Sequence, residues 1–204
     1  MSQLTLTSDP LGSATTGTFE YENPAFFMTG ATSQRGAVLV DQYTVLQATN
    51  TLTNATTAQA LFDVTGSGQV TLVAGTYEFD CQFLLSSMST NAASTFSFAL
   101  AGGATFNQYW TSTAVKAAAG TSANAQITHH TGASGVFPTN IASVSAVAAG
   151  AARVSGIVIV TVGGTLIPQI QQVAFATAAV VGIGSFFKIR ALGSSAATTS
   201  GNWS

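Results

Sequence analysis

A run of strict alternation over residues 76–83 constrains the fold of this chain more than any other feature. Every second position of the run carries an apolar or aromatic side chain, at Tyr77, Phe79, Cys81 and Phe83. Successive side chains of a β-strand point to opposite faces, so this period of two predicts a strand with one buried face. Helical periodicity is almost absent elsewhere, and we therefore expect an all-β protein.

Further segments rich in β-branched and aromatic residues recur between clusters of Gly, Asn, Ser and Thr. We expect strands at residues 38–46, 60–64, 69–72, 96–100, 154–162, 166–170 and 185–191. About eight strands with no helix between them favour an antiparallel β-sandwich of the jelly-roll type. The Ala-rich residues 115–125 and 141–152 lack helix caps and charge pairs, so we expect loops or short helical turns there.

The spacing of prolines, glycines and strands divides the chain into three parts. Residues 1–35, with Pro10 and Pro24, are expected to form an extended N-terminal arm. Residues 36–193 are expected to form the sandwich, and residues 194–204 a C-terminal tail rich in Ser, Thr and Ala.

The surface implied by the composition points to assembly. Only 6% of the residues are charged, against about a quarter in an ordinary soluble domain. A monomer with so few charges tends to associate. Residues 154–162 are apolar at both odd-numbered and even-numbered positions, so both faces of this strand would be apolar. A strand of an antiparallel sheet that is buried on both faces needs a second covering surface. A neighbouring subunit is the simplest source of that surface.

Several partner classes are excluded by the same composition. The five basic residues are scattered, whereas binding a phosphate backbone requires clustered Lys and Arg, so nucleic acid is not an expected partner. No uniformly apolar stretch of about 20 residues predicts a membrane-spanning helix, and the first residues do not have the pattern of a signal peptide. Cys81 is the only cysteine, which predicts a buried, inert thiol and no intrachain disulfide.

Two sets of residues resemble known families. The first, GTFEYEN at 17–23 with FFMT at 26–29 and RG at 35–36, resembles a stretch common in bacteriophage tail-fibre and other virion proteins. Glu22 and Asn23 stand where Asp-Gly is more usual in that stretch. The second set is similar to successive strands of C1q/TNF-like jelly rolls and comprises residues 74–79, 154–164, 167–170 and 185–187.

These resemblances imply a virion component: a fibre, a spike, or a decoration protein of the capsid or tail. The N-terminal arm would dock on other virion proteins, and host-surface glycan is a further implied partner. The chain would assemble in the host cytoplasm and leave by lysis within the virion. C1q/TNF-like domains form trimers in which one sheet of each subunit faces the three-fold axis. The trimer-interface candidates are the apolar residues Val154, Ile157, Val158, Ile159, Val160 and Val162.

His129 and His130 are the only histidines. Neighbouring residues of a strand point to opposite faces, so one strand cannot bring both imidazoles to one ion. One histidine from each of three chains could meet on a three-fold axis and bind a metal. An exposed loop pair is the expected alternative, and we predict no metal site and no cofactor.

No residue pattern predicts an enzyme. Glu78 and Asp80 lie two apart on one strand face, about 6–7 Å from each other, a separation that glycosidases use. We expect an outward polar face instead, and no catalytic residues. Phe106, Tyr109 and Trp110 could form an aromatic surface for sugars, which makes a carbohydrate-binding module or adhesin the alternative function; core or intersubunit packing is the expected role of these rings.

Overall fold

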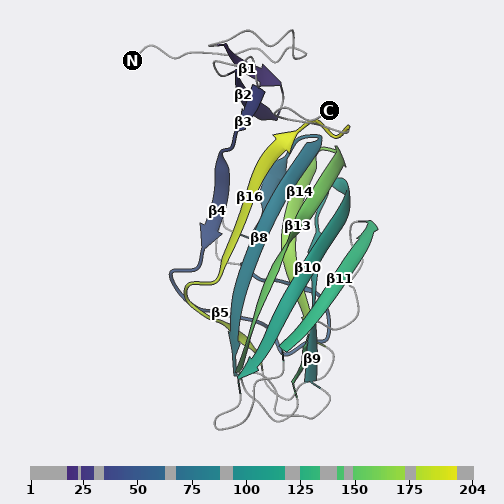
Figure 1. Cartoon of the computed structure of the whole chain (residues 1–204). Helices are drawn as coiled ribbons and strands as arrows, with labels where there is room; N and C mark the ends of the chain where they lie inside the picture. The colour runs from purple at the N-terminus through teal and green to yellow at the C-terminus, as the bar shows by residue number, and fades with distance from the viewer. Residues whose placement is uncertain are drawn as a thin grey trace.

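The computed structural model describes residues 18–22, 24–29, 35–62, 68–87, 94–117, 125–133, 142–144, 149–172 and 178–196. In this part of the chain all regular structure is β, and every strand pairing is antiparallel. Two sheets pack face to face as a sandwich, and a small third sheet lies beyond one end (Figure 1). The expected all-β sandwich is therefore confirmed. None of these residues forms a helix that could cross a membrane.

The larger sheet has eight strands. From its free edge inward it runs β11 (Ala125–Ala133), β10 (Thr105–Ala117), β13 (Ala149–Val162) and β8 (Gly75–Ser86). The far edge of β8 is shared between two pairs of strands. Residues 76–82 of β8 pair with β16 (Phe186–Gly193), which pairs in turn with β4 (Asp41–Val45). Residues 85–86 of β8 pair with β15 (Val180–Val181), which pairs with β5 (Asn50–Thr51).

The smaller sheet has five strands. Its order is β12 (Ala142–Val144), β9 (Ser94–Ala101) and β14 (Gly164–Gln172), and two short strands, β7 (Val70–Leu72) and β6 (Gln59–Ala60), share the far edge of β14. The sheet covers one face of the larger sheet, so the outer face of the larger sheet remains without a covering layer in the chain that is described.

An aromatic cluster fills the space between the two sheets. The predicted alternation of β8 is confirmed, since its odd-numbered residues are buried from Gly75 to Leu85. Phe79 and Phe83 stack on Phe98 of the opposite sheet with ring centroids 6.4 and 6.1 Å apart. Trp110 meets Phe98 edge-on at 5.7 Å. These rings bury large apolar areas at the centre of the sandwich.

The described parts of the Ala-rich segments lie in strands, where loops or helical turns were expected; residues 118–124, 141 and 145–148 lie outside the described chain. β10 continues through Ala117, β11 begins at Ala125, and β13 begins at Ala149. Residues 149–152 pair with residues 114–117 on one side, and residues 150–152 pair with 83–85 on the other. Backbone pairing on both sides stabilises alanine in a strand, although alanine is depleted from strands as a class.

Two other strand predictions need correction. Of the segment expected at residues 60–64, only Ala60 lies in a strand, the short β6, and Leu61 and Phe62 form a buried turn; residues 63–67 lie outside the described chain. Residues 38–46, expected as one bent strand or a pair, contribute to two different sheets.

The N-terminal segment is folded where an extended arm was expected. β1 (Phe19–Glu22), β2 (Ala25–Thr29) and β3 (Arg35–Val38) form a three-stranded antiparallel meander beside one end of the sandwich (Figure 1). Each of these short strands pairs with its neighbour in sequence, and the strands coincide with short β-prone segments of the sequence. β3 spans the boundary that was placed between residues 35 and 36. Residues 1–17, and residues 197–204 of the tail, lie outside the described chain.

Candidate functional site

The candidate site is the outer face of the larger sheet, meaning the side chains of β4, β8, β10, β11, β13 and β16 that point away from the smaller sheet. Strand register sets its rows. One row runs from Tyr109 through Ile157 and Glu78 to Arg190, and the next from Thr111 through Ser155 and Asp80 to Lys188. Apolar and charged side chains therefore lie next to each other on this face.

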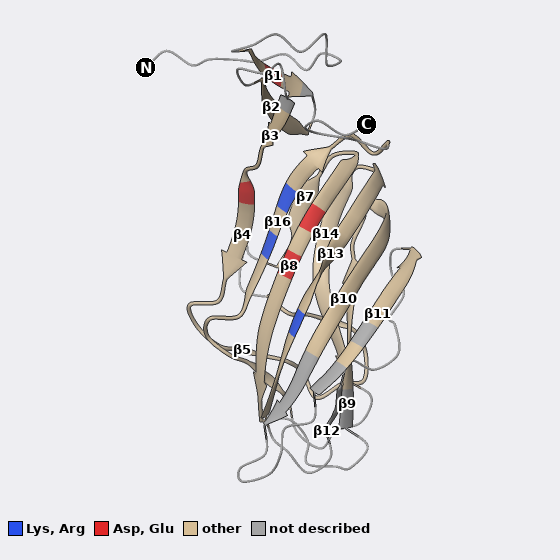
Figure 2. Ribbon diagram, in the orientation of Figure 1, with Lys and Arg blue, Asp and Glu red and all other residues tan. Residues whose placement is uncertain are grey.

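Three ion pairs occupy the β8 half of the outer face (Figure 2). Arg153 donates to both carboxylate oxygens of Asp80, with Nε–Oδ1 3.0 Å and Nη2–Oδ2 2.8 Å. Arg190 donates through Nε and Nη2 to Oε2 of Glu78, at 2.9 and 2.6 Å. Lys188 lies 3.9 Å from Asp41. The three cations match three carboxylates, so these six side chains carry no net charge together.

The paired-carboxylate interpretation of Glu78 and Asp80 has no support in this geometry. Each carboxylate is hydrogen-bonded to its own arginine, Asp80 to Arg153 and Glu78 to Arg190. The bond to Asp80 also raises the pKa of the Arg153 guanidinium. The two acids form a charged, outward-pointing part of the sheet, as the alternation of the strand predicts.

The six trimer-interface candidates are divided between two faces of β13. Val154, Val158 and Val160 are fully buried in the core of the chain itself, so an intersubunit contact cannot use them. Ile157 and Ile159 point to the outer face and are half-buried, and Val162 is 59% exposed at the end of the strand. The two apolar faces of β13 thus lie in different places: one face is in the core, and the other is part of the outer face of the sheet.

The three aromatic candidates are also separated. Phe106 and Trp110 are buried, and only Tyr109 reaches the surface, with 42% of its area exposed. Adjacent residues of β10 point to opposite faces, which is why Tyr109 and Trp110 diverge. An exposed platform made of all three rings does not exist, and the packing role expected for the other two rings agrees with their burial.

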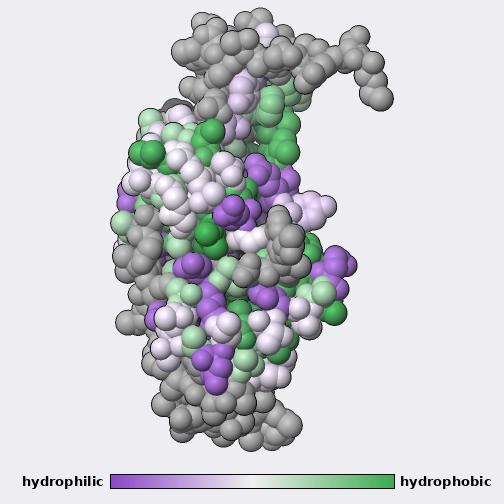
Figure 3. Space-filling model, turned by 180° about the vertical axis from the view of Figure 1, so that it is seen from behind, coloured by the Kyte–Doolittle hydropathy of each residue, from purple (hydrophilic) through white to green (hydrophobic). Residues whose placement is uncertain are grey.

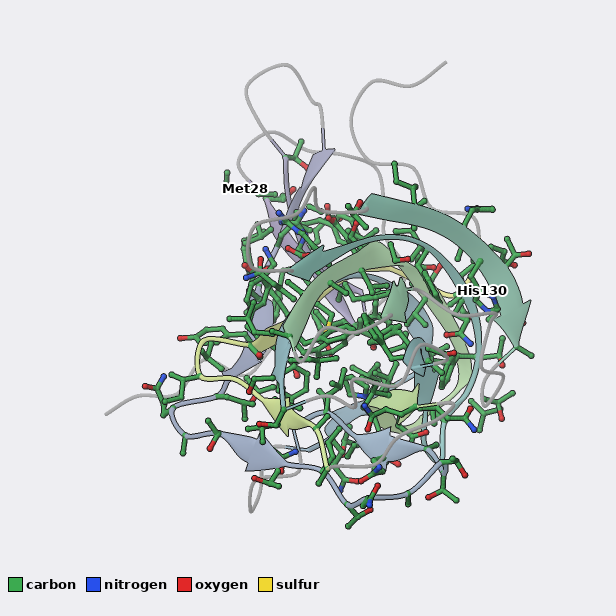
Figure 4. The ribbon with its side chains drawn as sticks, turned by 90° about the horizontal axis from the view of Figure 1, so that it is seen from below. Met28 and His130 are labelled. Atoms are coloured by element: carbon green, nitrogen blue, oxygen red, sulfur yellow. The ribbon has the colours of Figure 1, made fainter. Side chains whose placement is uncertain are left out.

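His129 and His130 lie in β11, where a loop was expected. His129 is exposed on the outer face, and His130 faces inward and packs on Trp110 with ring centroids 5.0 Å apart (Figure 4). Burial, with a smaller effect of His129, lowers the pKa of His130. The Nε2 atom of His130 and the Nε1 atom of Trp110 are buried without a hydrogen-bond partner. Among the described residues no three His, Cys, Asp or Glu side chains are grouped as metal ligands.

Cys81 is fully buried in the core, and burial raises the pKa of its thiol well above the ordinary value. A thiol that is kept protonated and out of contact with water is a poor nucleophile and a poor metal ligand. Its position matches the inert role that its place in the alternating strand predicts.

Two hollows were not predicted from the sequence. A shallow depression on the outer face lies over β8, β10 and β13 and is lined by Gln82, Leu84, Thr111, Thr113, Ala151, Ala152, Arg153 and Ser155. A cleft of about 220 Å³ opens between β4 and the β7 end of the smaller sheet, with Gln42 and Gln69 among its polar residues and Phe187 and Pro168 among its apolar ones. Neither is lined by a catalytic constellation.

The opposite side of the sandwich differs from the outer face of the larger sheet. Seen from behind, its described surface intersperses hydrophilic and hydrophobic residues (Figure 3). None of the ion pairs described above lies there, because all three belong to strands of the larger sheet.

Comparison with protein-family models, with curated proteins and with solved structures found no match to this chain.

Proposed function

We propose that this chain is a structural, non-enzymatic subunit of a bacteriophage virion: a fibre, a spike, or a decoration protein of the capsid or tail. The proposal is supported by the resemblance of residues 17–36 to virion proteins and by the low content of charged residues.

The subunit assembles as a homotrimer through the outer face of the larger sheet. The observation that carries this step is the combination of apolar side chains and neutralised charges on that face. Ile157 and Ile159 lie there beside Tyr109, and the nearby carboxylates are already bound by arginines. Burying a paired charge costs less than burying an isolated one. A neutral face also does not repel a second copy of itself.

The sandwich is a jelly roll of the C1q/TNF-like type. Support comes from the way the chain alternates between the two sheets: β7 and β9 belong to the smaller sheet, and β8 and β10 to the larger. After β11, which stays beside β10 in the larger sheet, β12 and β14 belong to the smaller sheet and β13, β15 and β16 to the larger. Consecutive strands that cross between sheets are typical of Greek-key sandwiches, of which the jelly roll is one.

The N-terminal meander and the segment before it dock the trimer on the particle. The meander lies beyond one end of the sandwich, so contacts made there leave the other end free for display (Figure 1). The displayed end would contribute to attachment to host-surface glycans. The subunit would accordingly be found in the virion, after assembly in the host cytoplasm and release by lysis.

The native mass of the full chain, measured by light scattering, tests the trimer. We expect three chains of 20.6 kDa each, or a multiple of three. Ile159→Lys places a charge on the outer face and should abolish the trimer, whereas Ile183→Lys, in an exposed turn, should leave the mass unchanged. A well-folded wild-type monomer at tens of micromolar overturns the trimer.

Labelling of purified particles with an antibody to the chain tests the virion assignment separately.

A further inference from the structure

The free edge of β11 is the longest unpaired strand edge in the described chain. β11 has nine residues and pairs with β10 along its whole length, and on its other side no described strand is bonded to it (Figure 1). Every other edge strand has five residues or fewer. Such an edge presents a row of backbone N–H and C=O groups that can pair with another strand.

The strand β11 itself has no charged residue, proline or bulge that would prevent pairing, and it is not short. Soluble proteins protect sheet edges with charged residues, prolines, bulges or very short strands. The sequence of β11, AQITHHTGA, contains no Asp, Glu, Lys, Arg or Pro, and its pairing with β10 continues without a register shift. Ile127 on its outer face is 78% exposed, the largest exposed fraction among the exposed large hydrophobic residues.

We propose that β11 pairs in antiparallel orientation with β11 of a second copy of this chain, which joins the two larger sheets edge to edge. A partner strand of matching length and neutrality is needed, and among the described edges only β11 itself meets both conditions. β4, the next longest edge, has five residues and carries Asp41. Two identical neutral strands can meet around a two-fold axis without opposing like charges.

Full overlap of the two strands fixes the register. The centre of β11 is His129, so residue 129 lies opposite 129 of the second copy, and Ile127 lies opposite Thr131. Opposed residues then point to the same face, as antiparallel pairing requires. Alternate residues of each strand contribute both backbone groups, so the contact adds about eight hydrogen bonds. This contact is independent of the proposed trimer, because it uses the strand edge and not the centre of the outer face.

Cysteine cross-linking of the full chain tests the pairing and its register. Opposed residues of antiparallel strands have Cα atoms about 4.5–5.5 Å apart, within the range for a disulfide. His129→Cys should therefore form a two-chain disulfide on mild oxidation. Thr131→Cys alone and Ile127→Cys alone should not, since each lies about 13 Å from its own copy, but a mixture of the two should cross-link. Native Cys81 is buried and does not interfere.

A charge on the edge provides the second measurement. Ile127→Lys should at least halve the native mass of the largest species, and Ile183→Lys, the same replacement in an exposed turn, should leave that mass unchanged. Equal cross-linking of His129→Cys and Thr131→Cys would overturn the proposal, as would an unchanged mass for Ile127→Lys. A trimer that lacks the His129 cross-link would refute the edge pairing alone, and a cross-linked dimer without trimers would refute the trimer alone.

Discussion

At the scale of single residues, His130 lies in an environment different from that of His129, its neighbour in sequence. Its ring lies against Trp110, its Nε2 atom is buried without a partner, and burial lowers its pKa below the ordinary 6.5. His129, one residue earlier, is exposed on the outer face. The two histidines that look equivalent in the sequence therefore lie in different environments, one exposed and one packed on an aromatic ring.

The lowered pKa predicts a loss of stability on acidification. The unfolded chain takes up the His130 proton first as the pH falls below 6.5, so the free energy of unfolding decreases from there down to the lower pKa of the folded state. Above pH 6.5 the stability is fully present. His130→Phe keeps a ring on Trp110 and removes the titration, so its urea-unfolding free energy should vary less between pH 7 and 5 than that of the wild type. An identical slope in the two proteins would contradict the prediction.

At the scale of elements, the close approach of β10 and β13 depends on a glycine. Gly156 lies opposite Trp110, and a Cβ built on Gly156 would lie 2.5 Å from the Cβ of Trp110 and closer still to the carbonyl oxygen of Tyr109. Real side chains do not tolerate such distances, and the atoms concerned belong to a strand backbone that cannot move alone. Gly156 thus allows the two strands and the indole ring to fit together.

Gly156→Ala should destabilise the sandwich by about 1–3 kcal/mol, the usual cost of overpacking. Chemical denaturation followed by tryptophan fluorescence measures this directly. Gly103→Ala is the matched control, because the nearest atom to its added Cβ is Oγ1 of Thr165 at 3.4 Å, an ordinary contact. A cost at position 156 no larger than that at position 103 would show that the strands can separate freely.

The strands also show how much of the fold can be predicted from the local sequence pattern. Alternation predicted β8 fully, because one face of that strand is polar and the other apolar. It failed for the Ala-rich ends of β10 and β13, since alanine gives no alternation and the strand is fixed by pairing with distant segments. The outward position of Glu78 and Asp80 followed from the same alternation. Their arginine partners did not, because those lie 112 and 73 residues away along the chain and depend on the strand register.

At the scale of the whole molecule, the ion pairs described above are gathered on one face of the sandwich. The three ion pairs lie on β4, β8, β13 and β16 of the larger sheet (Figure 2). Exposed ion pairs contribute little stability, about 0–1 kcal/mol each, and the side chain of Arg153 is 63% exposed. The fold therefore depends on the buried aromatic core, and the ion pairs chiefly make the outer face neutral.

The same core sets the boundary of the independently folding unit. The cluster of buried residues between the sheets has no member before Leu46. The N-terminal meander touches the sandwich only locally, for example where the ring of Pro24 lies over Gly75, and Met28 of β2 is exposed away from the core (Figure 4). The meander has buried residues of its own, Ala25, Phe27 and Thr29, but none of them belongs to the sandwich core.

Removal of residues 1–38 should consequently leave a folded sandwich with nearly unchanged near-ultraviolet circular dichroism and thermal midpoint. If the meander serves docking and not assembly, the truncated protein should also contain the same number of chains per oligomer as the full-length protein. Removal of residues 1–46 is the contrasting truncation. It deletes β4 and Leu46, a core residue whose N–H donates to the carbonyl of Ser185, and losing a buried leucine costs about 2–5 kcal/mol. The second truncation should therefore melt well below the first, and equal melting of the two would place the start of the folded unit after residue 46.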